Sequence, residues 1–334
     1  MKIAIVRLSS LGDIIHSLIV LEIIKAHQPH AHITWIVDER FYDLIRYHPL
    51  IDKVVSLSLK GALRHPSMII TSWQRLRHLG AFDLVIDLQG LLKSSLIARI
   101  LHAPVGGFGA LSTREPLAAL LYDRTIESPR NQSIVFRYFD LLRGLFGWNF
   151  DNNVAFNKQP LLHHNPTGNY HALSSYIAQE PPILLIPGSN WEAKNWPAEN
   201  YAKLTHELPG RYLILWGNER ERAVAEAIAC TGVGIKIAPK LRLDELIWLI
   251  GHVRLVIGGD TGPTHMAWAL NRPSIVLWGA TSMMATLQTP INIAITSESE
   301  IDEKRINKNN FSIRSIPVAT VAQVAQTLLD KEQS

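Results

Sequence analysis

Short apolar runs that favour β-strands alternate with helical patterns along almost the whole chain. The runs span residues 2–6, 32–37, 53–59, 82–88 and 103–109 in the first half, and 182–188, 211–217, 233–239, 254–260 and 273–280 in the second. Parallel strands need a long crossover connection, which is usually a helix. This alternation therefore predicts an α/β fold, in which parallel sheets carry helices on both faces.

Helical spacing of apolar residues marks the connecting segments. The clearest of these lie at 14–27, 94–101, 133–146, 199–208, 221–229, 243–253, 265–270 and 318–331. A stretch rich in Pro, Asn and His, residues 157–182, interrupts the pattern and is typical of a linker. We therefore expect two Rossmann-like domains facing a central cleft: 1–165, a linker at 166–180, and 181–314. A C-terminal helix within 315–334 could pack back toward the first domain.

Composition and charge narrow the class of protein. Of the 334 residues, 47% are hydrophobic and 19% are charged, as in a globular protein rather than a disordered one. Charges or His interrupt the longest apolar stretches before they reach the roughly 18 residues of a membrane span. Cys230 is the single cysteine, so no disulfide framework forms. With no targeting segment expected at the N-terminus, these features predict a soluble cytoplasmic protein.

The positive charge is concentrated in the first half. Residues 1–160 contain 18 Lys and Arg against 13 Asp and Glu, whereas the remainder contains 15 and 16. A basic half beside a neutral half indicates an anionic partner, although a chance surface excess explains the same counts. The chain has no Lys/Arg run and no nucleic-acid motif, so we expect no nucleic-acid partner.

The loop after the first strand poses a chemical question. "RLSSLGDIIHS" joins that strand to a helix and contains Ser10, Gly12 and Asp13. Unpaired N–H groups at a helix N-terminus attract anions such as phosphate, yet Asp13 places a carboxylate there. Asp13 either caps the helix, which is worth about 1 kcal/mol, or takes part in a reaction.

A glycine-containing loop in the second half is suited to a diphosphate. The segment consists of Asp260, Thr261, Gly262, Pro263, Thr264 and His265, and it opens a helix directly after a strand. Free backbone N–H groups, hydroxyls and the helix dipole would all favour phosphate oxygens. An ordinary N-cap turn at Asp260 or Thr261 is the alternative.

Two further strand ends in the second half offer polar groups. "PGSNWEAKNWP" contains Ser189, Asn190 and Lys194, and a Lys in such a loop either contacts phosphate or is a solvated surface residue. "LWGNERE" contains Trp216, Gly217 and Glu221. A carboxylate there could accept hydrogen bonds from both hydroxyls of a ribose, or simply complement the helix dipole.

Cations and small polar groups follow the strands of the first half. Gln89, Gly90 and Lys93 follow 82–88, Lys60 follows 53–59, and Arg114 lies in "STREPLA". They suit an acidic substrate, although each alone is more often a surface charge. No P-loop, complete dinucleotide fingerprint or zinc-ligand spacing occurs. A diphosphate here would therefore be neutralised by backbone N–H groups and cations.

Taken in order, these motifs resemble the ADP-heptose:lipopolysaccharide heptosyltransferases of glycosyltransferase family 9. "SSLGDIIHS", "VIDLQGLLKS", "TREPLA", "KNWP", "LWG…E" and "GGDTGPTH" carry the resemblance over nearly the whole chain. "QGLLKS" followed by "TREPLA" resembles the members that add the first heptose to Kdo. The resemblance implies a GT-B fold and an inverting transfer of heptose from ADP-heptose to the Kdo of Kdo-lipid A.

The resemblance also implies roles for the residues named above. Asp13 is expected to be the general base, with Lys194 as the second catalytic residue. The donor-binding set is Ser189, Asn190, Lys194, Trp216, Gly217, Glu221, Asp260, Thr261, Gly262, Pro263, Thr264 and His265. The acceptor-binding set is Ser10, Gly12, Lys60, Gln89, Gly90, Lys93 and Arg114. No metal or other cofactor is implied, and a monomer in peripheral contact with the cytoplasmic face of the inner membrane is expected.

The chain departs from the family pattern at three places. Ser189 and Asn190 stand where a Thr pair is common, Lys60 where Arg is familiar, and Ser133 where a His occurs. These changes put acceptor preference in question more than the type of reaction. Alternatives are an enzyme adding the second heptose, a GT-B UDP-sugar epimerase, and a two-domain ligand-binding protein without enzymatic activity.

Overall fold

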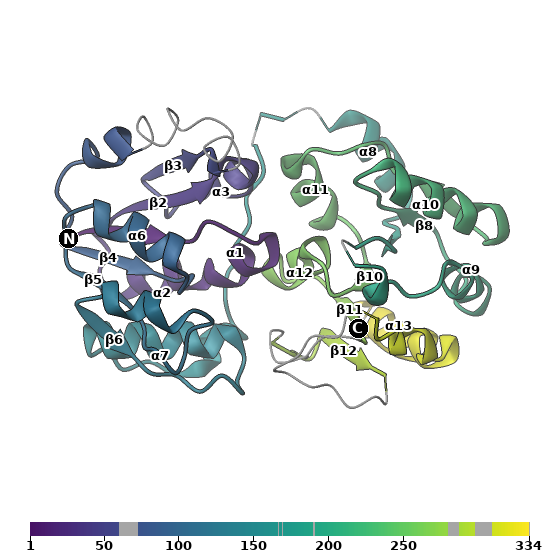
Figure 1. The fold of residues 1–334 in the computed structure, drawn as a ribbon. Coiled ribbons are helices and arrows are strands. Elements are labelled where there is room, and N and C mark those ends of the chain that lie inside the picture. The colour runs from purple at the N-terminus through teal and green to yellow at the C-terminus, as the bar shows by residue number, and fades with distance from the viewer. Residues whose placement is uncertain are drawn as a thin grey trace. The chain divides into compact units, whose positions relative to one another are not determined.

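The computed structural model divides the chain into two compact units, residues 1–163 and 164–334 (Figure 1). It describes residues 1–59, 73–165, 167–168, 170–189, 191–279, 287–297 and 309–333. Each unit is built around one six-stranded parallel sheet. The unit boundary lies two residues before the predicted end of the first domain at 165.

The first sheet has the strand order β3-β2-β1-β4-β5-β6. The strands are β1 (Lys2–Val6), β2 (His32–Asp38), β3 (Lys53–Leu57), β4 (Leu84–Asp87), β5 (Val105–Phe108) and β6 (Arg124–Ile126). The helices are α1 (Leu11–Ser17), α2 (Ile19–His27), α3 (Tyr42–Ile45), α6 (Leu92–Ile100) and α7 (Ile134–Phe146), with 3-10 turns η1 (Glu39–Phe41), η2 (Pro116–Leu121) and η3 (Asn152–Ala155).

The second sheet has the order β12-β11-β10-β7-β8-β9. Its strands are β7 (Ile183–Ile186), β8 (Tyr212–Ile214), β9 (Ile235–Ile237), β10 (Leu255–Gly259), β11 (Ser274–Trp278) and β12 (Asn292–Thr296). The helices are α8 (His171–Ile177), α9 (Ala198–Glu207), α10 (Glu219–Thr231), α11 (Leu243–Ile250), α12 (Gly262–Ala269) and α13 (Val318–Gln333), with η4 (Glu192–Lys194) and η6 (Ser312–Ser315). Counted within its unit, each sheet has the Rossmann order 3-2-1-4-5-6.

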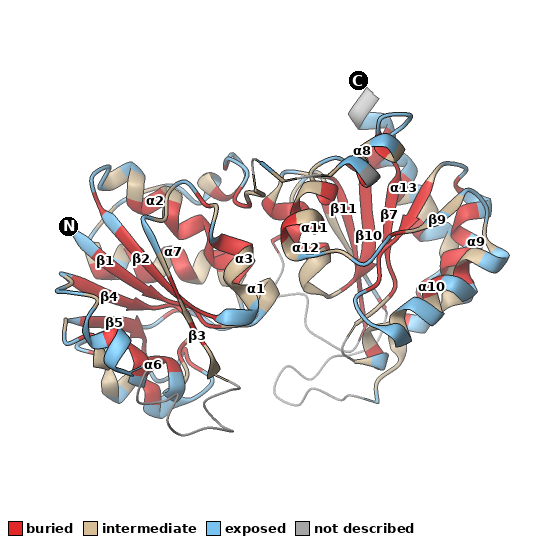
Figure 2. Cartoon of the chain, turned by 90° about the horizontal axis from the view of Figure 1, so that it is seen from above, coloured by how far each residue is buried: buried red, intermediate tan, exposed pale blue. Residues whose placement is uncertain are grey.

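The central strands of both sheets are buried on both faces, which explains their continuous Ile, Val and Leu runs (Figure 2). Every residue of β4, β5, β7, β10 and β11 is buried. Among the described residues, no helix is long and apolar enough to cross a membrane. Ligand-binding side chains in such a sheet must therefore come from the loops at the strand ends.

The structure differs from the sequence prediction at several elements. The edge strands β6 and β12 were not predicted, although β3 and β9, at the other edges of the two sheets, were. β6 has three residues and is mostly exposed, and most of β12 is only half-buried. The helix predicted over 14–27 begins at Leu11 and is divided at Leu18 into α1 and α2. The buried side of α13, with Val321, Ala325 and Leu328, joins the core of the second unit.

A buried carboxylate closes the end of β4. Asp87 is fully buried, and its Oδ2 accepts hydrogen bonds from the hydroxyls of Ser94 and Tyr122, both at 2.7 Å. Its Oδ1 accepts from the backbone N–H groups of Gln89 at 2.8 Å and Gly90 at 3.3 Å. Burial raises the pKa of Asp87, whereas these hydrogen bonds favour the charged form. Asp87 therefore fixes the loop that leads into α6.

We predict that Asp87→Ala lowers the free energy of unfolding by about 2–4 kcal/mol, because it leaves a phenol and two loop amides without an acceptor. Tyr122→Phe removes one hydrogen bond and should cost only about 1 kcal/mol. Urea unfolding followed by circular dichroism measures both variants. Equal losses in the two variants would show that Asp87 does not organise the loop.

Candidate active site

Two adjacent loops form the candidate site of the first unit. β1 and β4 pair in parallel, with Val6 opposite Asp87, so the loop before α1 and the loop before α6 leave the sheet side by side. Arg7 and Gln89 cross-link them: Arg7 Nη1 donates to the Leu88 carbonyl at 2.7 Å, and the Leu8 N–H donates to Gln89 Oε1 at 2.8 Å. The predicted residues Ser10, Gly12, Asp13, Gln89 and Gly90 therefore lie on neighbouring loops.

Asp13 is held in the first turn of α1 by three contacts to one oxygen. Its Oδ2 accepts from the Ser10 N–H at 3.1 Å and the Ser10 hydroxyl at 2.8 Å, and lies 3.0 Å from Arg7 Nη2. The Asp13 side chain is 47% exposed, whereas that of Arg7 is only 6% exposed. All three contacts fall on Oδ2, which leaves Oδ1 available to a partner from solvent.

The electrostatics of this loop favour the carboxylate form of Asp13. Partial burial by itself raises the pKa of Asp13, but the charge of Arg7 and the hydrogen bonds from Ser10 lower it below its usual value. Asp13 is thus both part of the helix cap and an accessible carboxylate. The two readings of the first loop are compatible in this geometry.

Sequence reasoning missed Arg7 and Tyr138. Arg7 directly follows a buried strand, and a buried Arg at that place is a signal for a partner carboxylate. Tyr138 of α7 is fully buried; burial, opposed by the charge of Arg7, raises its pKa to about 12. Within the described part of the chain, its hydroxyl has no hydrogen-bond partner. Nothing in the local sequence around Tyr138 indicates that it packs near this loop.

The predicted acceptor residues differ in their placement. Gly90 has φ +68°, and a Cβ there would lie 3.2 Å from Cγ2 of Thr113, so the loop before α6 contacts the loop before η2. The Leu92 N–H donates to Glu115 Oε2 at 2.7 Å and joins the same two loops. Lys93 and Arg114 flank this junction and are exposed. Lys60 lies outside the described residues.

In the second unit, Asp260 is the centre of an ionic cluster at the end of β10. Its Oδ2 pairs with Lys194 Nζ, and its Oδ1 lies 2.9 Å from His265 Nε2. The three side chains are between 7% and 18% exposed. Burial would raise the pKa of Asp260, but the hydrogen bond and charge of His265 and the charge of Lys194 lower it strongly. The structure thus brings together a predicted cation and a predicted loop carboxylate.

The backbone of β10 allows this cluster to form. A Cβ at Gly259 would lie 2.5 Å from the Lys194 carbonyl oxygen, so only glycine lets η4 approach the strand so closely. Lys194 Nζ also lies 5.0 Å from the centre of the Trp191 ring. Gly262 and Pro263 open α12, and the buried Thr264 hydroxyl lies 3.1 Å from that of Thr261. The first amides of α12 lack intrahelical acceptors and suit an anion.

The remaining predicted donor residues are largely engaged in local structure. Glu221 Oε2 accepts from the Gly217 N–H at 2.7 Å, which leaves Oε1 for a ligand. The Trp216 indole donates to the Ala238 carbonyl at 2.7 Å and is buried. The Ser189 hydroxyl donates to the Trp191 carbonyl at 2.6 Å. Asn190 lies outside the described residues.

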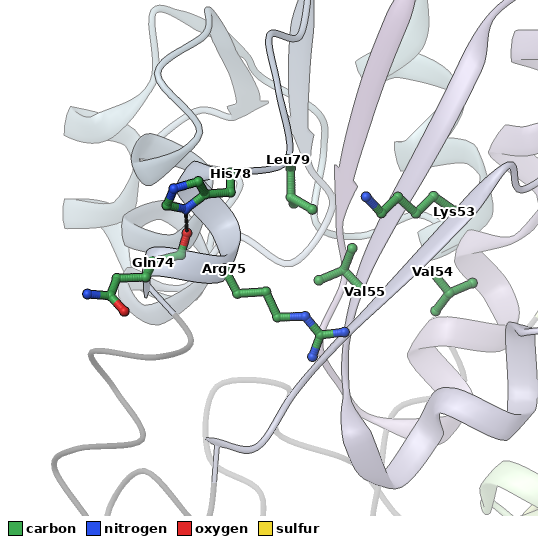
Figure 3. Close-up of a pocket in the computed structure, with 7 residues that line it drawn as sticks. All are labelled: Lys53, Val54, Val55, Gln74, Arg75, His78 and Leu79. Carbon is green, nitrogen blue, oxygen red and sulfur yellow. Dashed lines mark hydrogen bonds between the residues drawn. The ribbon is translucent and has the colours of Figure 1, made fainter.

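A separate pocket of about 560 Å³ lies on the first unit (Figure 3). Lys53, Val54 and Val55 of β3 form one side, and Gln74, Arg75, His78 and Leu79 form the other. Lys53 is the first residue of β3, whereas the candidate loops follow the carboxyl ends of the strands. The pocket therefore contains no predicted site residue. Among the described residues, no group of His, Cys, Asp and Glu side chains is arranged to hold a metal ion.

Solved structures show which fold class these two sheets define. The chain aligns with "E. coli heptosyltransferase WaaC with ADP" at a TM-score of 0.76 and 23% identity, covering 99% of each chain. E. coli heptosyltransferase II aligns at 0.72 and 21% identity, covering all of both chains. The fold is therefore GT-B, as the motifs predicted.

The sequence comparisons identify the family. The family model described as glycosyltransferase family 9 (heptosyltransferase) matches residues 69–311. Lipopolysaccharide heptosyltransferase 1 of Campylobacter coli is 35% identical over 99% of this chain and 100% of its own length. The enzyme of the same name from Pseudomonas aeruginosa is 29% identical over 84% of this chain and 79% of its own length. The chain belongs to glycosyltransferase family 9, the heptosyltransferases.

We predict that Asp260→Asn makes the free energy of unfolding less dependent on pH in the acid range. Because its pKa is lowered in the folded state, Asp260 contributes stability above the unfolded pKa of about 4, and this contribution is lost as pH falls below it. The variant should lose about 2 kcal/mol near pH 7 and less near pH 3. Urea midpoints at both pH values test this. Glu226→Gln is the control, because Glu226 is exposed and pairs with Arg222 at 3.1 Å. An equal loss at both values would contradict the ionic role.

Proposed function

We propose that this chain transfers L-glycero-D-manno-heptose from ADP-heptose to the Kdo of Kdo-lipid A. The observation that supports this most directly is the full-length match to a heptosyltransferase 1, together with an exposed carboxylate held at the end of β1. The structural neighbours support the donor, because they were solved with ADP and with ADP-2-deoxy-2-fluoro heptose. The proposed place of action is the cytoplasmic face of the inner membrane.

In the proposed reaction Asp13 is the general base. Its free oxygen takes the proton of a Kdo hydroxyl while that oxygen forms a bond to the anomeric carbon of heptose. The bond from that carbon to the ADP oxygen breaks, and ADP leaves with the electron pair, so the configuration inverts. A carboxylate can assist because proton transfer is needed only as the new bond develops. The anomeric centre acquires oxocarbenium character, as in glycoside hydrolysis.

The second unit is proposed to stabilise the leaving diphosphate. The amides at the start of α12 and the Lys194 ammonium group are the donors, and loss of one such donor typically costs a factor of about 10²–10³. Because Lys194 is paired with Asp260, the carboxylate sets where the ammonium group lies and offsets part of its charge. Glu221 would accept from the ribose hydroxyls, and Lys93 and Arg114 would face the anionic acceptor.

We predict that Asp13→Asn lowers acceptor-dependent ADP release by a factor of about 10²–10⁴. Because it also removes the negative charge beside the buried Arg7, urea unfolding of the variant is measured alongside, and activity is compared where both proteins are folded. The amide oxygen still accepts from the Ser10 N–H but cannot take a proton. Asp43→Asn is a matched control, since Asp43 is 45% exposed and pairs with Arg46 at 3.1 Å. Full activity of Asp13→Asn would make Asp13 a cap only. Release with a heptosylated acceptor but not with Kdo-lipid A would indicate the second-heptose reaction.

We further predict that Arg7→Met moves the acid limb of the pH–kcat/KM profile upward. Arg7 holds the pKa of Asp13 down, and an adjacent Arg typically lowers a carboxyl pKa by about 1–3 units. Without this charge, Asp13 becomes protonated at a higher pH and activity is lost earlier on acidification. Arg7→Lys keeps the charge and should restore most of the profile. An unshifted limb in Arg7→Met would show that Arg7 does not control the base.

A further inference from the structure

Exposed leucines are concentrated in one part of the first unit. Among the described residues, nine large apolar side chains are strongly exposed, and five of them are leucines between positions 92 and 120. Their exposed fractions are 37% for Leu92, 54% for Leu96, 82% for Leu111, 61% for Leu117 and 79% for Leu120. Single exposed leucines are ordinary, but a concentration of them on a soluble protein marks an interaction site.

Four of these leucines lie on the outer sides of two touching elements. Leu92 and Leu96 are four residues apart on α6, and Leu117 and Leu120 are three residues apart on the 3-10 turn η2, so each pair shares one side. The opposite sides, with Ile97 and Ala98 of α6 and Ala118 of η2, pack into the same core. We call Leu92, Leu96, Leu117 and Leu120 the leucine surface. In Figure 2 exposed residues mark the outer side of α6.

The charges around the leucine surface favour an anionic partner. Residues 92–121 contain three cations, Lys93, Arg99 and Arg114, and one carboxylate, Glu115. Arg99 is paired with Asp123 at 2.7 Å, so the positive charge that borders the leucines comes from Lys93 and Arg114. Glu115 accepts the Leu92 N–H, so part of its charge is satisfied within the protein. Exposed leucines bordered by Lys and Arg match a bilayer with anionic headgroups, since the apolar groups enter the acyl region and the cations remain at headgroup level.

The leucine surface is also continuous with the predicted acceptor loops. The Leu92 N–H contacts Glu115, and Gly90 contacts Thr113, so the loops bearing Lys93 and Arg114 border the surface directly. An enzyme whose acceptor is anchored in lipid must bring its acceptor-binding loops to the membrane plane. We infer that the leucine surface docks this protein on an anionic lipid bilayer. This inference rests on the proposed function for its biological setting, but not for its physical test.

The test is sedimentation of the full chain with vesicles of equal parts phosphatidylethanolamine and phosphatidylglycerol, free of any acceptor. The double variant Leu96→Ser, Leu120→Ser should lower the partition coefficient between vesicles and water by a factor of about 10–10². Each leucine side chain that no longer enters the bilayer lowers it by about tenfold. Replacing the same two residues by Met should retain binding. Val233→Ser, at an apolar residue of the second unit that is 54% exposed, is the matched control and should bind as the wild type does.

Other outcomes overturn the inference. Unchanged partition of the Ser variant, or an equal loss in Val233→Ser, would exclude the leucine surface as the docking site. Unchanged vesicle binding with slower turnover of only the acylated acceptor would assign the surface to the acceptor's own acyl chains. If the wild type self-associates but does not bind vesicles, and the Ser variant no longer self-associates, the leucine surface is a contact between copies of this chain.

Measurements of ADP release distinguish failure of the docking surface from failure of the proposed function. With a water-soluble, deacylated acceptor, the Ser variant should release ADP as fast as the wild type, because the leucine surface contains no residue assigned to the reaction. If neither protein releases ADP with any acceptor while the vesicle result holds, the proposed function fails and the docking surface remains. If ADP release is normal and vesicle binding is unaffected, only the docking surface fails.

Discussion

The parallel pairing of β1 with β4 is the constraint on which the first unit depends. Because both faces of these strands are buried, polar side chains can reach solvent only beyond the ends of the strands. Arg7 and Asp87 lie at those ends and are themselves buried, so each must find partners within the protein. Arg7 contacts Asp13 and the Leu88 carbonyl. Asp87 accepts from amides of the next loop and from the hydroxyls of Ser94 and Tyr122. The need to satisfy two buried charges thus shapes both loops of the candidate site.

In the second unit the central charge at the strand end is a carboxylate rather than a guanidinium, and it too needs partners within the protein. Asp260 is a largely buried carboxylate at the end of β10, and it is compensated by Lys194 and His265. The close approach of η4 to Gly259 makes this possible. The same Rossmann order therefore carries a half-exposed carboxylate held by a buried Arg in one unit, and in the other a largely buried carboxylate held by Lys194 and by the still more buried His265. In the proposed reaction the first carboxylate removes a proton, and the second positions Lys194 for the leaving diphosphate.

Much of the fold followed from residue patterns, because central parallel strands require continuous apolar runs. All ten strands predicted from such runs are present, although most are shorter than their runs, β8 and β9 the most. The edge strands β6 and β12 were not predicted, whereas the edge strands β3 and β9 were, so exposure at an edge weakens the apolar pattern without always removing it. The motif loops before α1, α6 and α12 lie at strand ends as expected. The role of Tyr138 was not predictable, because it reaches Arg7 and Asp13 from α7, far along the chain. Arg7, in contrast, lies close to Asp13 in the sequence, and its place directly after a buried strand was a signal that the prediction did not use.

The leucines of α6 and η2 illustrate the same limit. In the sequence "LLKSSLIARI" and "PLAALL" each have enough apolar residues for a buried helix, and nothing local distinguishes inner from outer leucines. Only packing decides that Ile97 and Ala118 enter the core while Leu96 and Leu120 stay outside it. The sequence by itself determined the α/β class, the two-unit organisation and the family motifs, because these depend on local periodicity and spacing. The tertiary structure decided the partners of Asp87 and Asp260 and the exposure of the leucines, because these depend on contacts between segments far apart in the chain.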